Sequence, residues 1–296
     1  MLLITFVDGA GSRLGVLDAA HSELVDLSQA APGLPSDMLR LIALGAEGLA
    51  EVRRVLATDT ARRPLGSVRL LAPISHPARN IICVGKNYRE HVQEVRSLAA
   101  DSAFASDAIP AAPIFFTKAT SSVIGPGMPI PASSDPTQSV DYEGELAVVI
   151  GPGGRGIAAA DALRHVFGYT ILNDVTSRRL QGRHQQWFLG KSLDGFCPLG
   201  PAILTADAVP DVRQLRVQTR VNGELRQDGV LAELIFDIPT LIETLSRCMT
   251  LEPGDILATG TPAGVGMGFK PARYLKPGDR VAISIEPIGT LENPVV

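Results

Sequence analysis

Short apolar runs separated by turn-forming residues recur along the whole chain and predict a protein built mainly of β-strands. Three runs stand near the start, at residues 2–7, 13–17 and 23–27. Further runs follow at residues 80–84, 113–117, 146–150, 167–172, 199–204, 216–221, 255–259 and 280–285. Asn222-Gly223 is a strong type I′ turn signal and predicts a hairpin between 217–221 and 225–227. We therefore expect an α+β fold that is mostly β.

Apolar residues at helical spacing are fewer. One such run begins after Ser36, a candidate N-cap, and continues to Leu56. Further helices are expected at about residues 89–98, 158–165, 176–182 and 238–249. The last of these has Asp237 as a candidate cap and Pro239 just inside it.

Turn-forming residues at 62–66 interrupt the pattern. We therefore predict a small N-terminal α+β domain at residues 1–70 and a larger domain at residues 71–296. Residues 97–112 are weakly patterned, and we expect a mobile loop or lid there.

Composition narrows the classes of function. The 296 residues are 45% hydrophobic and carry a net charge of −4 without a long basic block, so nucleic acid is not an expected partner. No apolar run approaches the roughly 20 residues of a membrane span, and the first residues resemble a strand more than a signal peptide. The three cysteines are scattered and fit neither a disulfide framework nor a zinc site. We expect a cytoplasmic protein that does not bind a membrane.

Residues 141–145, Asp-Tyr-Glu-Gly-Glu, hold two carboxylates at the mouth of a predicted strand. Side chains alternate along a strand, so Glu143 and Glu145 point to the same face. Like charges repel there unless a cation compensates them, and carboxylates suit Mg²⁺, Mn²⁺ and Ca²⁺. The alternative is an exposed strand edge with two solvated glutamates.

Two further segments carry candidate chemistry. His91 and Glu94 meet on one face of a predicted helix, where the carboxylate would orient the ring as a general base, although a chance surface pair has the same spacing. Asp174 ends a hydrophobic strand and can supply a third metal ligand, or it can cap the helix expected at 176–182.

A lysine and a glycine-rich segment complete the candidates. Lys191, between apolar residues and glycines, can stabilise an enolate if it is desolvated, or it can be a surface lysine. Residues 259–266 (Thr-Gly-Thr-Pro-Ala-Gly-Val-Gly) expose backbone amides that can hold an anion, unless the segment is a plain turn.

The order of these segments resembles that of the fumarylacetoacetate hydrolase family over about three quarters of the chain, from Pro73 onward. The matching segments are residues 84–88, 91–94, 141–145, 173–176, 190–196, 221–223 and 259–266. The resemblance implies a mixed β-sandwich roll and a catalytic domain at 71–296. The first 70 residues look like the small appended domain of two-domain members, but less closely.

The resemblance also implies roles for individual residues. Glu143, Glu145 and Asp174 would hold Mg²⁺ or Mn²⁺, with Ca²⁺ possible in their place. His91, Glu94 and Lys191 would be catalytic, and Arg178, Gln181 and Thr261 would bind substrate. Two departures concern the substrate: Arg179 stands where many members have an acidic residue, and the stretch after Glu94 is longer than in compact members.

The implied activity is hydrolysis of the C–C bond of an acylpyruvate-type 2,4-dioxo acid, such as fumarylpyruvate, through a metal-stabilised enolate. Oxaloacetate decarboxylase and 2-hydroxyhepta-2,4-diene-1,7-dioate isomerase are alternatives on the same site. A non-catalytic, metal-dependent binder of 2-oxo acids is an alternative of another class. Members of the family are usually homodimers.

Overall fold

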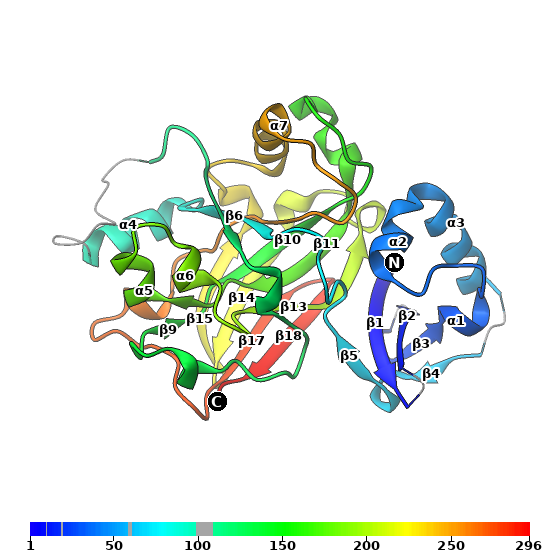
Figure 1. Cartoon of the computed structure of the whole chain (residues 1–296), viewed down its shortest axis with the longest axis horizontal. Helices are drawn as coiled ribbons and strands as arrows, with labels where there is room; N and C mark the ends of the chain where they lie inside the picture. Colours follow the sequence, from blue (N-terminus) through cyan, green and yellow to red (C-terminus); the bar gives the residue numbers. More distant parts are fainter. Residues whose placement is uncertain (10, 19, 59–60, 99–108) are drawn as a thin grey trace.

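The computed structural model describes residues 1–9, 11–18, 20–58, 61–98 and 109–296 (Figure 1). Strands exceed helices in this part of the chain, so the predicted mostly-β class is confirmed. Most of the segment at 97–112, for which we predicted a loop or lid, lies outside the described residues. No helix in the described segments is both long enough and apolar enough to cross a membrane.

Within the described residues, twelve strands form one mixed sheet. Its main path runs through β4 (Arg63–Pro64), β3 (Glu23–Asp26), β2 (Gly11–Leu17), β1 (Leu2–Asp8), β13 (Cys197–Thr205), β11 (Val166–Asn173), β10 (Gly144–Ile150), β16 (Ile256–Ala258), β6 (Ile81–Gly85) and β7 (Ile114–Lys118). Two short strands lie off this path, β5 (Arg69–Leu71) beside β1 and β8 (Val123–Ile124) beside β13. Both β10 and β11 are buried along their whole length, which explains their continuous apolar runs.

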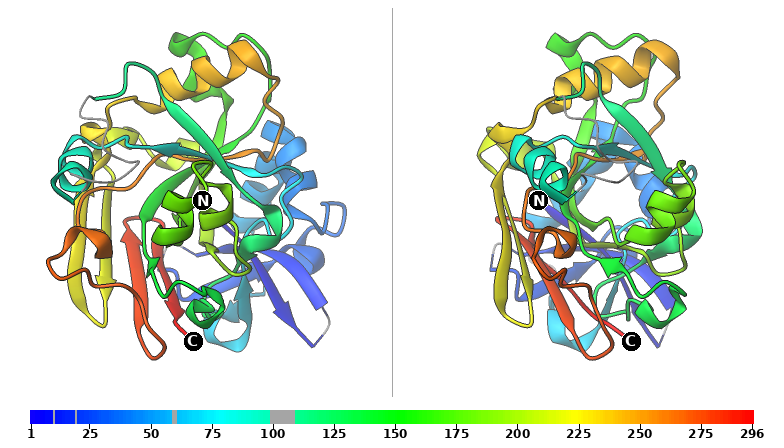
Figure 2. Two further views of the ribbon diagram at one scale, coloured as in Figure 1. Left: turned by 60° about the vertical axis from the view of Figure 1, so that its left-hand side comes forward. Right: turned by 90° about the vertical axis from the view of Figure 1, so that its left-hand side faces the viewer.

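A second, antiparallel sheet packs against the first. Its strands in order are β15 (Glu224–Val230), β14 (Arg216–Val221), β17 (Arg280–Ile285) and β18 (Gly289–Pro294). It contacts β10, β11 and β13 of the large sheet, and Val217, Ile283 and Leu291 share a core with Leu146 and Ile171. Figure 2 shows its yellow and red strands beside the green strands of the large sheet. The two sheets form the predicted sandwich.

The helices are short and lie around the sheets. They are α1 (Leu27–Ala30), α2 (Met38–Ala43), α3 (Gly45–Leu56), α4 (Arg89–Leu98), α5 (Arg178–Arg183), α6 (Phe188–Lys191) and α7 (Ile238–Cys248). The 3₁₀ turns are η1 (Leu65–Ser67), η2 (Thr120–Ser122), η3 (Ala132–Ser134), η4 (Ala159–His165), η5 (Ala206–Ala208), η6 (Val212–Gln214), η7 (Leu231–Glu233) and η8 (Gly266–Gly268). In Figure 1, α4, α5 and α6 gather at one end of the molecule, away from α2 and α3.

The single helix that we predicted after Ser36 is wrong. Two helices occupy this stretch, because Gly45 adopts φ +56°, a left-handed conformation that ends α2 before α3 begins. The cap is Asp37 and not Ser36, since the Asp37 carboxylate accepts a hydrogen bond from the amide of Arg40.

Two other expectations about local structure are confirmed. Asn222 and Gly223 have φ +52° and +83°, as a type I′ turn requires, and they join β14 to β15. Asp237 caps α7 by accepting a hydrogen bond from the amide of Thr240.

The helix predicted at 158–165 is instead the 3₁₀ turn η4, which packs against α7. Ser246 and Glu243 of α7 accept hydrogen bonds from the amides of Ile157 and Ala159, so side chains of another helix satisfy donors at its start. The helix predicted at 176–182 begins at Arg178 and ends at Arg183, because residues 176–177 pair as β12 with β9 (Val140–Asp141).

The large sheet continues across the predicted boundary at residue 70. Leu2 and Leu3 of β1 pair with Leu204 and Ile203 of β13, so the blue elements in Figure 1 extend the sheet of the larger part. The division of the chain at residue 70 stays a prediction.

Candidate active site

Three buried carboxylates meet where β10 and β11 lie side by side. Glu143 directly precedes β10, Glu145 lies within it, and Asp174 directly follows β11. The antiparallel register pairs Gly144 with Asn173, which brings the strand ends together. One oxygen from each of the three carboxylates lies within 4.8 Å of the others. The alternative of an exposed strand edge is therefore wrong, and we call these three residues the triad.

The surroundings shift the pKa values of Glu145 and Glu143 in opposite directions. Burial raises the pKa of the Glu145 carboxyl well above its ordinary value, and the charges of Asp174 and Glu143 raise it further. Burial also opposes ionisation of Glu143, but Lys191 and Arg178 hold the pKa of its carboxyl well below the ordinary value. Hard oxygen donors that repel one another in a buried site fit a divalent cation such as Mg²⁺ or Mn²⁺.

Two buried lysines contact the triad. The Nζ of Lys191 lies 2.7 Å from Oε2 of Glu143 and 2.6 Å from Oδ2 of Asp174, so Lys191 is not a surface lysine. The Nζ of Lys118 lies 2.7 Å from Oδ1 of Asp174 and donates a hydrogen bond to the carbonyl of Val175. Asp174 therefore binds lysines and does not cap a helix.

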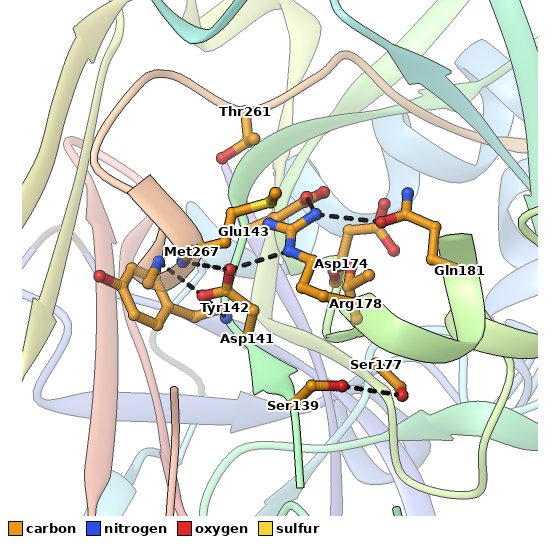
Figure 3. Close-up of polar contacts among 12 residues, drawn as sticks. Ser139, Asp141, Tyr142, Glu143, Asp174, Ser177, Arg178, Gln181, Thr261 and Met267 are labelled. Atoms are coloured by element: carbon orange, nitrogen blue, oxygen red, sulfur yellow. Dashed lines mark hydrogen bonds and ion pairs between the residues drawn. The ribbon is translucent and has the colours of Figure 1, made fainter. Parts of the chain in front are cut away.

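Arg178, at the start of α5, also contacts Glu143 of the triad (Figure 3). Its Nε is 2.8 Å from Oδ2 of Asp141, and its Nη1 is 2.5 Å from Oε1 of Glu143 and 3.4 Å from Oε1 of Gln181. Its Nη2 is buried and has no hydrogen-bond partner among the described residues. A buried donor of this kind is suited to an anionic ligand.

His91 and Glu94 form the predicted pair on α4. The Nδ1 of His91 lies 3.1 Å from Oε2 of Glu94, and His91 is buried, so the pair is not an incidental surface contact. The other oxygen of Glu94 accepts a hydrogen bond of 2.9 Å from the amide of Gly264. Glu94 is thus fixed from one side and orients the imidazole from the other.

The glycine-rich segment at 259–266 binds carboxylates of the protein itself. The amides of Gly260, Gly264 and Gly266 donate to Glu145, Glu94 and Asp141, respectively, so the segment is more than a plain turn. The anions that these amides bind are carboxylates of this chain.

Thr261 lies in the same glycine-rich segment. Its hydroxyl donates to the carbonyl of Gly144 and accepts from Nε2 of Gln227. It therefore anchors β10, and its contact with a substrate carboxylate stays a prediction.

A pocket of about 480 Å³ contains these groups. Its lining consists of Val84, Gly85, Lys86, His91, Phe116, Glu143, Glu145, Arg178, Gln181, Trp187, Lys191, Thr261 and Met267. The rings of Phe116 and Trp187 meet edge to face at 5.1 Å, and a Cβ at position 85 would lie 2.4 Å from Trp187. Gly85 is required for this wall because any side chain there would displace the indole.

Seven of the nine predicted site residues line this pocket, and the other two, Glu94 and Asp174, contact lining residues. Lys118, Asp141 and the aromatic wall were not among the predicted site residues. A signal for Lys118 existed, because a lysine that ends an apolar strand needs a carboxylate partner if it is buried. Apart from the adjacent amide of Tyr142, the donors to Asp141 come from distant segments and left no local signal.

Comparisons with known proteins agree with this geometry. A family model described as Fumarylacetoacetate (FAA) hydrolase C-terminal matches residues 80–296. Oxaloacetate tautomerase YisK of Bacillus subtilis is 46% identical over 289 residues, covering 94% of this chain and 91% of the relative.

Two solved structures extend the similarity over the whole chain. The fumarylacetoacetate hydrolase EaFAH of Exiguobacterium antarcticum has a TM-score of 0.84 and 45% identity, covering 100% of this chain and 99% of that chain. The maleylpyruvate hydrolase of Sphingobium sp. SYK-6, in complex with manganese(II) and pyruvate, has a TM-score of 0.80 and 36% identity with the same coverage. This chain therefore belongs to the fumarylacetoacetate hydrolase family of enzymes.

Proposed function

We propose that this enzyme acts on 2-oxo dicarboxylic acids with the help of a divalent cation, and that its main reaction is the keto–enol tautomerisation of oxaloacetate. The observation that carries the proposal is the triad, which lies beside Lys191 and the unpartnered Nη2 of Arg178 in one pocket. Such a site suits a substrate that chelates a cation and also carries negative charge. The 46% identity to a protein named oxaloacetate tautomerase supports this choice of reaction.

Glu143, Glu145 and Asp174 would hold Mg²⁺ or Mn²⁺, and Ca²⁺ fits the same oxygen donors. When bound, the cation supplies Lewis-acid polarisation of the 2-oxo group. The manganese in the related maleylpyruvate hydrolase structure supports this type of cation.

The protein's own groups would move the proton. Tautomerisation transfers a proton between a carbon and an oxygen of the substrate, so one group must accept it and another must stabilise the charge on oxygen. His91 is our candidate for the proton at carbon, because Glu94 engages its Nδ1 and so orients Nε2 for the substrate. Lys191 would donate a hydrogen bond to the negative oxygen.

Arg178 and Gln181 would bind a substrate carboxylate. Gln181 is buried, and its Oε1 faces Nη1 of Arg178, so the two side chains present donors to the same part of the pocket. Lys86 adds positive charge to the wall. A pocket with several cationic groups favours a diacid over a substrate with a plain acyl chain.

Hydrolysis of an acylpyruvate such as fumarylpyruvate is the second candidate. The buried His91–Glu94 pair favours it, because a histidine oriented in this way can also activate a water molecule. The similarity to a maleylpyruvate hydrolase points in the same direction. Decarboxylation of oxaloacetate and isomerisation of a 2-hydroxy-dienedioate use the same groups and belong in the same set of assays.

The test compares four reactions of the purified protein with Mg²⁺, with Mn²⁺ and with a chelator. Loss of the ultraviolet absorbance of enolic oxaloacetate reports tautomerisation, and pyruvate formation reports decarboxylation. Loss of fumarylpyruvate reports hydrolysis, and loss of the conjugated dienol reports isomerisation. We expect metal-dependent tautomerisation to be the fastest reaction.

Two other outcomes would contradict this proposal. Fast hydrolysis of fumarylpyruvate with no effect on oxaloacetate would favour the second candidate. Metal-dependent binding of oxalate without turnover of any substrate would favour the non-catalytic binder. The homodimer stays a prediction, which light scattering of the purified protein tests.

A further inference from the structure

Asp141 is a fully buried aspartate beside the triad, and hydrogen-bond donors occupy both of its carboxylate oxygens (Figure 3). Its Oδ1 accepts from the amides of Tyr142 at 2.9 Å and Gly266 at 2.6 Å. Its Oδ2 accepts from the amide of Met267 at 3.0 Å and from Nε of Arg178 at 2.8 Å. A carboxylate engaged in this way is a strong charge-assisted acceptor and holds its donors in place.

One arm of this network is the guanidinium of Arg178. The short ladder of β9 and β12 pairs Asp141 with Thr176, and the amide of Arg178 then donates to the carbonyl of Ser139. The backbone therefore places Arg178 opposite Asp141. Asp141 holds Nε while Glu143 holds Nη1, so two carboxylates set the plane of the guanidinium and the direction of Nη2.

The other arm is the backbone at 264–268. Asp141 binds the amides of Gly266 and Met267, and the amide of Gly264 in the same segment binds Glu94, the partner of His91. The segment packs tightly against both carboxylates. A Cβ at position 266 would lie 2.6 Å from Oδ1 of Asp141, and one at position 268 would lie 2.1 Å from Oε1 of Glu94.

We propose that Asp141 is a positioning residue that fixes the relative positions of two parts of the site that lie far apart in the sequence. It fixes the guanidinium of Arg178 that receives the substrate carboxylate, and it fixes the backbone that holds the Glu94–His91 pair. Asp141 is not a metal ligand, because N–H donors surround its oxygens. The inference rests on the proposed function where it assigns a 2-oxo acid to Arg178 and His91.

Asp141→Asn tests the proposal, because the amide keeps the size of the side chain while an NH₂ group replaces one acceptor. The probes are Mn²⁺ alone and oxalate, which mimics a planar 2-oxo acid enolate, both measured by calorimetry. We expect the affinity for Mn²⁺ to stay within about threefold and the affinity for oxalate to fall about 10- to 100-fold, the usual effect of removing an orienting partner. In turnover assays, kcat should fall and KM should rise.

A double-mutant cycle separates positioning from general damage. Arg178→Lys should weaken oxalate binding, and Asp141→Asn should cost less in that background than in the wild type, because both changes remove the Asp141–Arg178 interaction. Additive losses would overturn the proposal, as would an Asp141→Asn variant that binds oxalate like the wild type.

Asp26→Asn is the matched control. Asp26 is also buried, accepts a hydrogen bond from the amide of Ser28, and its Oδ2 lies 2.8 Å from Nη1 of Arg13; none of these residues lines the pocket. This variant should lose stability but keep its oxalate affinity within about threefold. An equal loss of oxalate binding in Asp26→Asn would overturn the assignment.

Gly266→Ala is a second variant if Asp141→Asn does not fold. Its new Cβ would lie 2.5 Å from the carbonyl oxygen of Arg273 and 2.6 Å from Oδ1 of Asp141, so the backbone and the carboxylate must move apart while the charge of Asp141 is kept. It should show the same pattern, with Mn²⁺ affinity retained and oxalate affinity lost. Normal oxalate binding in Gly266→Ala would overturn the proposal.

The oxalate measurements do not depend on turnover. A wild-type protein that binds oxalate with Mn²⁺ but converts none of the substrates contradicts the proposed function and leaves the role of Asp141 measurable. A wild-type protein that does not bind oxalate in the presence of Mn²⁺ contradicts both.

Discussion

Glu145 differs from the other two carboxylates of the triad in what it contacts. Glu145 accepts a hydrogen bond from the amide of Gly260, whereas Glu143 and Asp174 bind the ammonium of Lys191. Burial and the charges of Asp174 and Glu143 raise the pKa of the Glu145 carboxyl, whereas Lys191 and Arg178 overcome burial at Glu143 and lower its pKa. Electrostatic repulsion among the three carboxylates is therefore strongest at Glu145.

Binding of Mn²⁺ should release a proton from Glu145. Below its raised pKa, Glu145 is protonated in the metal-free protein, and the cation must displace that proton. Affinity should therefore strengthen as pH rises, by up to about tenfold per pH unit for one proton, and level off above the pKa. Calorimetric titrations in buffers of different ionisation enthalpy count the protons. Glu145→Gln is the control, since it has no proton to release, and a pH-independent wild-type affinity would contradict the prediction.

His91 and Glu143 should separate proton transfer from metal binding. His91→Ala should lower kcat by about 10²- to 10⁴-fold and leave Mn²⁺ affinity nearly intact, because the imidazole is not part of the triad. Glu143→Ala should lose both, because few carboxylates hold the cation. Equal loss of Mn²⁺ affinity in the two variants would show that this division of roles is wrong.

For individual residues, the sequence indicated most of the acidic and basic side chains of the site but not all of their partners. Strand alternation brought Glu143 and Glu145 together, and helical spacing brought His91 and Glu94 together. The partner of Lys118 was not predictable, because its contact with Asp174 joins segments more than 50 residues apart in the chain. Such long-range pairs leave no periodicity in the sequence.

Among the elements, the hairpin of β14 and β15 follows most directly from local chemistry. Gly223 has φ +83°, and a Cβ at this position would meet nothing within 4 Å. Gly223→Ala should therefore lower the free energy of unfolding by about 1 kcal/mol through backbone strain alone. Gly66→Ala is the matched control, since Gly66 is also in open space but has no left-handed φ, and it should be nearly neutral. Urea denaturation of both variants checks the difference, and an equal effect would contradict the role of φ.

Element boundaries were less predictable than element types. The apolar pattern after Ser36 runs through the break at Gly45, because α2 and α3 bury residues of the same core. At the predicted helix 158–165, the chain forms the 3₁₀ turn η4 packed against α7, and Glu243 of α7 accepts a hydrogen bond from the amide of Ala159. The first boundary follows from a local glycine conformation, whereas the second element lies at a tertiary contact.

The whole molecule is joined by a sheet that passes from the first strands into the strands of the active site. Leu3 is fully buried, pairs with Ile203 of β13, and shares a core with Val149 and Phe167. A change in β1 should therefore affect the site-bearing part of the chain. A division at residue 70 does not by itself imply two independent folding units.

Leu3→Ala should lower the free energy of unfolding by about 2–5 kcal/mol, because it leaves a cavity at this junction. Trp187 is the single tryptophan of the chain and reports on the pocket. Its fluorescence and the far-ultraviolet circular dichroism should show the same lowered midpoint in urea. Leu225→Ala, at an exposed leucine, is the control and should change little. A fluorescence midpoint that Leu3→Ala leaves unchanged would favour a separately folding N-terminal domain.

The sequence by itself determined the mostly-β class, the hairpin at Asn222-Gly223, the carboxylate pair at 143 and 145, and the resemblance to a metal-dependent family. These features depend on residue type and short spacing, which the chain displays directly. Only the tertiary structure decided that Asp141 joins Arg178 to the backbone at 264–268, and that Lys118 contacts Asp174. These contacts form because non-local strand pairing brings distant segments together, and the burial that results makes every charge require a partner.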